Sequence, residues 1–189
     1  MGVRRPGRVV LLNGPSSSGK SSIAEAMLDL LPGPWFHVPV DAVNAMRSTP
    51  RQAPLDDEAL AEVLERTRRG YHRVLAALAE AGNDVIADYP LSEPWRLDDL
   101  LVVLDGIDVT LVDVVCSNEE LERRERARAD RPRGLASSQR VYEHGDRDVT
   151  VDSSAALPAE CAWRVVDSMG TVARPKAFDR LRAARGAGR

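Results

Sequence analysis

The residues best suited to chemistry lie near the N-terminus, where the segment from Gly14 to Ser21 reads GPSSSGKS and matches G-x-x-x-x-G-K-[ST]. Two glycines let the backbone fold so that successive N–H groups point at phosphate oxygens. A helix beginning near Lys20 adds its N-terminal amides and the positive end of its dipole. The spacing predicts a phosphate loop in which Lys20 reaches the β- and γ-phosphates and the Ser21 hydroxyl binds magnesium.

The alternative is a serine- and glycine-rich turn that matches the motif by chance. Two observations favour the phosphate loop: it lies between a strand-like and a helix-like segment, and Lys20 and Lys176 are the only lysines among 26 basic residues. A lysine kept among arginines suggests a position where the wide guanidinium fork would not substitute. We expect ATP and Mg²⁺ as cofactors, with nucleotide contacts from Gly14, Pro15, Ser16, Ser17, Ser18, Gly19, Lys20, Ser21 and Ser22.

Two carboxylates, Asp41 and Asp88, each follow a short apolar run of strand length. Ligands of open parallel sheets bind beyond the carboxyl ends of the strands, so both side chains should face the phosphate loop. Asp41 would accept a proton from an attacking hydroxyl, or it would cap a helix from Ala42 onward. Asp88 would hold magnesium through water, orient the acceptor, or serve as a turn residue. Asp152 is weaker and is interpreted as structural.

A segment dense in arginine follows Cys116 and is predicted to form a lid over about 119–140. Interleaved glutamates at i,i+3 and i,i+4 spacing make much of it an ordinary solvated face. The functional interpretation is a lid whose arginines neutralise the transferring phosphoryl group. We expect two or three of the six arginines of this segment to have that role. The six are Arg123, Arg124, Arg126, Arg128, Arg131 and Arg133.

Strand-like and helix-like runs alternate along the chain, which predicts an α/β fold with a parallel sheet and right-handed crossovers. The expected strands are 8–13, 36–40, 84–88, 108–116 and 149–152. The expected helices are 20–31, 56–81, 95–104, 118–129, one from about 135, and 158–169. Residues 1–173 form one kinase domain in this interpretation, and the basic tail 174–189 is expected to be flexible.

Composition limits the partners. At 189 residues and a net charge of −3, the chain gives no global reason to expect nucleic acid or an anionic membrane. No apolar run reaches the length of a membrane span, no secretory signal is recognised, and two cysteines are too few for a disulfide framework. We therefore expect a cytoplasmic protein. His37, His72 and His144 lack metal or triad spacing and are interpreted as packed or surface residues.

These motifs, taken in order, resemble the chloramphenicol phosphotransferase-like family of P-loop kinases over about 9–169. The resemblance rests on the runs at 12–21, 34–41, 85–88, 116–131, 139–152 and 160–163. It implies a nucleotide-kinase-like fold with a five-stranded parallel sheet. It also implies that Asp41 is the catalytic base and that Arg124, Arg128 and Arg131 belong to the lid pattern. The segments 43–52 and 89–95 depart from the chloramphenicol enzyme, so a different hydroxylated antibiotic or a metabolite is expected as acceptor.

The leading hypothesis is an ATP- and Mg²⁺-dependent O-phosphotransferase that modifies a hydroxyl of a small molecule, such as an antibiotic. A nucleoside or metabolite kinase of the same fold is the first alternative, since Arg47 and Arg51 in the acceptor segment would suit a mononucleotide. A nucleotide-dependent switch or binding module is the second, although no guanine-recognition motif is present and only the basic tail suggests a partner. A homo-oligomer is left open.

Overall fold

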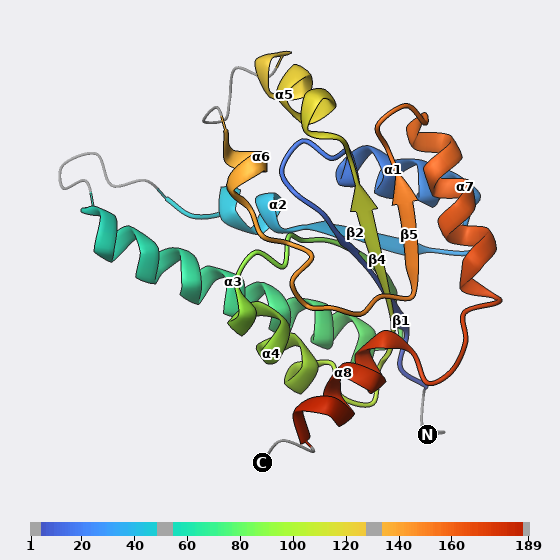
Figure 1. Ribbon diagram of the computed structural model, residues 1–189. Coiled ribbons are helices and arrows are strands. Elements are labelled where there is room, and N and C mark those ends of the chain that lie inside the picture. Colours follow the sequence, from blue (N-terminus) through green and yellow to red (C-terminus); the bar gives the residue numbers. More distant parts are fainter. Residues whose placement is uncertain (1–4, 49–54, 128–133, 187–189) are drawn as a thin grey trace.

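The computed structural model describes residues 5–48, 55–127 and 134–186, with side chains omitted at 135 and 137. Five strands form one parallel sheet in the order β2-β3-β1-β4-β5, as Figure 1 shows. The strands are β1 (Arg8–Asn13), β2 (Trp35–Pro39), β3 (Asp84–Asp88), β4 (Asp108–Val115) and β5 (Val149–Asp152). The predicted α/β class and five-stranded parallel sheet are confirmed.

The central strand β1 is covered on both faces. Its residues 9–12 are fully buried, as the uninterrupted apolar run of a central parallel strand requires. Val9 and Leu11 pack with residues of α3 (Asp57–Glu80), α4 (Pro94–Val103) and α8 (Ala177–Gly186). Val10 and Leu12 face the other way, toward α1 (Lys20–Leu30) and α7 (Pro158–Met169). Among the described residues, no helix is both long and apolar enough to cross a bilayer.

Strand register fixes which side chains meet at the carboxyl edge of the sheet. Leu12 of β1 lies opposite Asp88 of β3, and Asp88 lies opposite Pro39 of β2. The phosphate loop starts two residues after Leu12, and α2 (Val40–Ala45) starts directly after Pro39. Three short segments far apart in the sequence therefore begin side by side. The helices α5 (Asn118–Ala127) and α6 (Leu135–Ser138) lie beyond the same edge (Figure 1).

Two predictions about the second half of the chain are corrected. The helix expected from Leu135 has only four residues, and the chain then continues as a connection to β5. The tail expected to be flexible contains α8, whose Phe178 and Leu181 are buried against the sheet. The buried Lys176 side chain, just before α8, donates to Thr110 Oγ1 at 2.8 Å and lies 2.6 Å from Asp108 Oδ1. The composition was misleading because a short arginine-rich helix can still dock through a few buried side chains, here beside the ion pair of Lys176 with Asp108.

The two phenylalanines of the chain offer a test of this docking. Phe178 is 1 % exposed and Phe36 is 45 % exposed. Phe178→Ala should lower the free energy of unfolding by about 3–5 kcal/mol, the usual cost of emptying a buried aromatic site. Phe36→Ala should cost under about 1 kcal/mol because its side chain is already half in water. Urea unfolding of both variants measures the difference, and equal small losses would mean that α8 is not packed.

The helices α3 and α4 are joined by a polar cluster around Asp99. This carboxylate accepts hydrogen bonds from His72 Nδ1 at 2.6 Å, from Arg69 at 3.1 Å and from Arg73. The His72 side chain is fully buried, and its burial lowers its pKa to about 4 despite the opposing effect of Asp99. His72 is therefore neutral at pH 7 and donates its Nδ1 proton, in agreement with its predicted packing role.

Burial of neutral His72 predicts acid sensitivity. In the unfolded chain His72 takes up a proton near pH 6.5, whereas the folded residue does so only at about pH 4. The unfolded state binds more protons in this window, so the free energy of unfolding should fall by at most about 3 kcal/mol as the pH drops through it. His72→Asn keeps an N–H donor but cannot titrate. Its unfolding free energy, measured in urea from pH 7 to 4, should decline less steeply than that of the wild type.

Candidate active site

The loop between β1 and α1 has a backbone that only glycine permits at two positions. A Cβ on Gly14 would lie 2.6 Å from the carbonyl oxygen of Val114, closer than real contacts allow. Gly19 has a φ of +89°, in the left-handed region that glycine occupies without strain. The hydroxyls of Ser17 and Ser18 are buried without a hydrogen-bond partner among the described residues. The loop is thus a tight cradle with polar groups available to a ligand.

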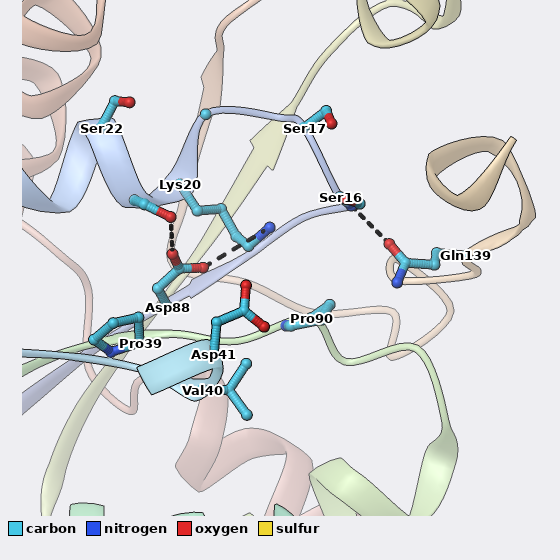
Figure 2. A pocket seen from close by; sticks show the side chains of 12 residues that line it. Ser16, Ser17, Lys20, Ser22, Pro39, Val40, Asp41, Asp88, Pro90 and Gln139 are labelled. Atoms are coloured by element: carbon cyan, nitrogen blue, oxygen red, sulfur yellow. Dashed lines mark hydrogen bonds and ion pairs between the residues drawn. The ribbon is translucent and has the colours of Figure 1, made fainter. Parts of the chain in front are cut away.

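Lys20 lies inside this cradle and is 7 % exposed. Its ammonium group donates to the carbonyl oxygens of Gly14 at 3.0 Å and Pro15 at 2.8 Å, and it lies 3.9 Å from Asp88 Oδ1. The Ser21 hydroxyl donates to the other oxygen of Asp88 at 2.5 Å (Figure 2). Asp88, at the end of β3, is therefore placed against both functional side chains of the phosphate loop.

Asp41 enters the same pocket from α2. The pocket is lined by loop residues 16–22, except Ser18, together with Pro39, Val40, Asp41, Asp88, Pro90 and Gln139. In Figure 2 the Asp41 carboxylate points into the space between Lys20 and Pro90. The helix begins at Val40 with Pro39 as its N-cap, so the alternative that Asp41 caps a helix from Ala42 is wrong. Asp41 and Asp88 are thus brought together with the loop, as predicted.

On the other side of the loop, Arg124 of α5 reaches across to two segments. Its guanidinium donates to the carbonyl oxygen of Ser17 at 3.3 Å and to that of Ser153 at 2.6 Å. Ser153 also donates through its hydroxyl to the carbonyl oxygen of Ser18 at 2.7 Å. A second pocket lies here, lined by Ser17, Arg124 and Ser153 together with Gly19, Ser22, Ala156 and Pro158. The predicted lid residues Arg128 and Arg131 lie outside the described residues.

The other described lid arginines behave as a solvated face. Arg123 pairs with Glu120 and Arg126 pairs with Glu122, and both guanidinium groups are mostly exposed. The interpretation that part of this segment is ordinary helix surface therefore holds for Arg126, whereas Arg123 also lines the second pocket. Arg124 also pairs with Glu120, but it is different because it contacts the phosphate loop as well.

The sequence assigned no role to Asn13, which proves to be a buried junction. Its amide nitrogen donates to Asp113 Oδ1 and to the carbonyl oxygen of Val141, both at 2.7 Å. Its amide oxygen accepts from the N–H of Leu91 at 2.9 Å. Nearby, Gln139 accepts from the N–H of Ser16 at 2.6 Å. The sequence feature that could have indicated this role of Asn13 is a polar residue at the end of an apolar strand, directly before the loop.

The donor set in the pocket suits magnesium. The Ser21 hydroxyl and the Asp88 carboxylate are hard oxygen ligands, and Mg²⁺ is usually held by one or two protein groups together with phosphate oxygens and water. No cluster of three or more His, Cys, Asp or Glu side chains suited to a metal occurs in the described residues. The fit is therefore to a metal that arrives with a nucleotide and not to a site built from protein ligands alone.

A parallel sheet, a phosphate loop leading from its central strand into a helix, and carboxylates at the ends of two neighbouring strands together define a P-loop kinase. More particularly, the chain belongs to the chloramphenicol phosphotransferase-like family, whose sequence profile matches residues 7–170. It is thus a phosphotransferase with a hydroxyl group as acceptor, which favours an enzyme over a nucleotide-dependent switch.

Several known proteins are similar to the chain. Sequences from two strains of Mycobacterium tuberculosis, both named as candidate O-phosphotransferases, are 30 % identical over 93 % of this chain and 88 % of their own length. The solved structure of a Janibacter sugar kinase superposes with a TM-score of 0.62, 23 % identity, and coverage of 87 % of this chain and 95 % of the other. The M. tuberculosis APS kinase CysC gives a TM-score of 0.65, 21 % identity, and coverage of 87 % and 98 %.

Removal of the Asn13 side chain should weaken both the fold and the loop. Asn13→Ala leaves the Leu91 N–H and one Asp113 oxygen without this buried partner, which should cost about 2–4 kcal/mol of unfolding free energy. The phosphate loop starts at the next residue, so the affinity for Mg-ATP should fall as well. The exposed Asn118→Ala is the matched control. Urea unfolding and calorimetric titration with Mg-ATP measure both effects, and wild-type values for Asn13→Ala would remove its junction role.

Proposed function

We propose that this chain is a cytoplasmic kinase that transfers the γ-phosphoryl group of ATP, with Mg²⁺, to a hydroxyl of a small molecule. The observation that carries the proposal is the single pocket shared by Lys20, Ser21, Asp88 and Asp41. It combines a phosphate cradle, a magnesium-type donor pair and a second carboxylate at the start of α2 that lines the same space.

In the proposed complex the triphosphate lies in the loop. The amides of residues 14–22 and the start of α1 would bind phosphate oxygens, and Lys20 would turn from the loop carbonyls to the β- and γ-phosphates. The nucleoside would occupy the second pocket, beside Arg124. Support comes from the position of this pocket next to Gly19, on the opposite side of the loop from Asp41.

Magnesium would be held by Ser21 and by Asp88, directly or through water, and when bound it neutralises charge on the phosphate oxygens. The remaining chemistry belongs to the chain. Asp41 would accept the proton of the acceptor hydroxyl as that oxygen bonds to the γ-phosphorus. The bond from phosphorus to the β,γ-bridging oxygen breaks, and ADP leaves with its electron pair. Lys20 would stabilise the charge that develops on the transferred group.

The lid arginines complete the proposal. The family pattern assigns this charge-stabilising role to Arg128 and Arg131, in addition to the observed contact of Arg124 with the loop. We propose an antibiotic-type acceptor on the strength of the family, and a nucleoside or metabolite acceptor as the second candidate. The second candidate is favoured by the surplus positive charge around Arg68 of α3, which is described below.

Asp41→Asn should abolish most of the phosphotransfer while leaving nucleotide binding intact, since the amide cannot take the proton. The rate should fall by a factor of about 10²–10⁴. The measurement is mass-spectrometric detection of phosphorylated products from hydroxylated antibiotics, nucleosides, sugars and their acids, incubated with ATP and Mg²⁺.

Asp29→Asn, on the exposed face of α1, is the control of equal charge change. A product formed at full rate by Asp41→Asn would remove Asp41 as the base but keep the kinase. If the wild type phosphorylates nothing and binds no Mg-ATP, the proposed function itself fails.

A further inference from the structure

Beside the pocket, the described residues of α3 and of the first turns of α4 form a cluster with more positive than negative charge. The helix α3 runs from beyond the carboxyl edge of the sheet down across its face (Figure 1). Its Tyr71 hydroxyl donates to the carbonyl oxygen of Val38 at 2.8 Å, at the level where β2 ends and Asp41 follows. Arg68 lies three residues earlier, about 4.5 Å further out along the helix axis and on the same face as Tyr71. The helix therefore places Arg68 beyond the strand ends, on the side where Asp41 lies.

Arg68 is poorly paired for its degree of burial. Its side chain is 23 % exposed, and its ion pair with Glu93 is long, with 3.9 Å between Nη1 and Oε1. Glu93 is shared, because it also accepts from Arg96 and from Trp95 Nε1 at 2.7 Å. Burial and the neighbouring charge of Arg96 lower the pKa of Arg68, which is the effect expected of an incompletely neutralised cation.

The charges of the cluster around Arg68 do not balance. Neutral His72 adds no charge, and the carboxylate of Asp99 is held by Arg69 and Arg73. Four arginines thus face three carboxylates among the described residues of this cluster, which are Arg68, Arg69, Arg73, Arg96, Glu65, Glu93 and Asp99. One positive charge is left over, and Arg68 is the guanidinium farthest from its carboxylate.

The cluster is connected to the pocket that holds Asp41. Buried Arg96 donates to the carbonyl oxygen of Pro90 at 2.8 Å, and Pro90 lines that pocket. Tyr89, between Asp88 and Pro90, lies under the guanidinium of Arg96, 5.4 Å from its ring centroid. The Tyr89 hydroxyl is buried and has no hydrogen-bond partner within the described ranges. The chain segment that carries Asp88 thus joins the surplus charge to the reaction site.

We propose that the acceptor carries an anionic group, a carboxylate or a phosphate, which binds Arg68 while the acceptor hydroxyl lies at Asp41. This rests on the proposed function and names its substrate class as a hydroxylated acid or a phosphate monoester, in place of a neutral antibiotic. An anionic oxygen pair matches the planar guanidinium fork and supplies the missing negative charge.

The first test compares related neutral and anionic acceptors, namely nucleosides with their 5′-monophosphates and aldoses with their aldonic acids. The wild type should use one anionic member with at least about tenfold higher kcat/KM, the usual effect of a hydrogen bond to a charged group. Arg68→Gln should raise KM for that acceptor by about 10- to 100-fold with kcat within about threefold, and Arg68→Lys should recover part of the loss.

Arg66→Gln is the matched control, since the Arg66 side chain is 69 % exposed on the same helix and its ion-pair partner among the described residues is Glu62, one turn earlier. It should leave KM unchanged. Equal use of neutral and anionic acceptors, or an unchanged KM in Arg68→Gln, overturns the proposal while the kinase stands. Preference for aldonic acids identifies a carboxylate acceptor, and preference for monophosphates identifies a phosphate acceptor.

A second test needs no acceptor. Acetate and inorganic phosphate are titrated into the Mg-ADP complex, and the Nε–Hε signal of Arg68 is followed by NMR. The signal is assigned by its loss in Arg68→Gln, and a saturable shift of it that is kept in Arg66→Gln supports the anion site. If this signal shows no saturable shift, the anion site is overturned. This outcome can be read even where the wild type phosphorylates no compound and the proposed function has failed by its own test.

Discussion

Parallel register at the carboxyl edge of the sheet is the constraint on which the site depends. Leu12, Asp88 and Pro39 lie side by side on three neighbouring strands, so whatever follows them in the sequence must share one small volume. Hydrogen bonding between strands allows no sliding here, because a shift of one residue would turn every buried side chain to the opposite face. The pocket is therefore built on fixed strand ends, although its residues come from four separate segments.

Connecting loops at this edge are held by side chains that replace missing backbone partners. Asn13 binds backbone groups of the β3–α4 connection and of the connection into β5. Ser153 and Arg124 do the same on the opposite side of the phosphate loop. Buried backbone groups must be paired, so each of these side chains fixes the loop conformation that it serves. The phosphate loop is thus supported from both sides by residues outside its own motif.

The arginines around Arg68 differ from those of the lid in their pairing and their exposure to water. The described lid arginines other than Arg124 pair with glutamates on an exposed helix face, where such pairs contribute little. Arg96 instead lies over the Tyr89 ring and shares Glu93 with Arg68, and both arginines have limited access to water. A charge kept in such surroundings is costly, which agrees with the proposed role of Arg68 in binding an anionic acceptor.

The sequence by itself determined the parallel α/β sheet, the phosphate loop, and the approach of Asp41 and Asp88 to it. Those features depend on local pattern: apolar runs of strand length, a glycine-lysine motif of fixed spacing, and the rule that parallel strands end at one edge. Only the tertiary structure decided the junction at Asn13, the docking of α8 and the unbalanced charge at Arg68. Each of these depends on contacts between residues 25 or more positions apart, such as Arg68 with Glu93 or Lys176 with Asp108, and no local pattern encodes them.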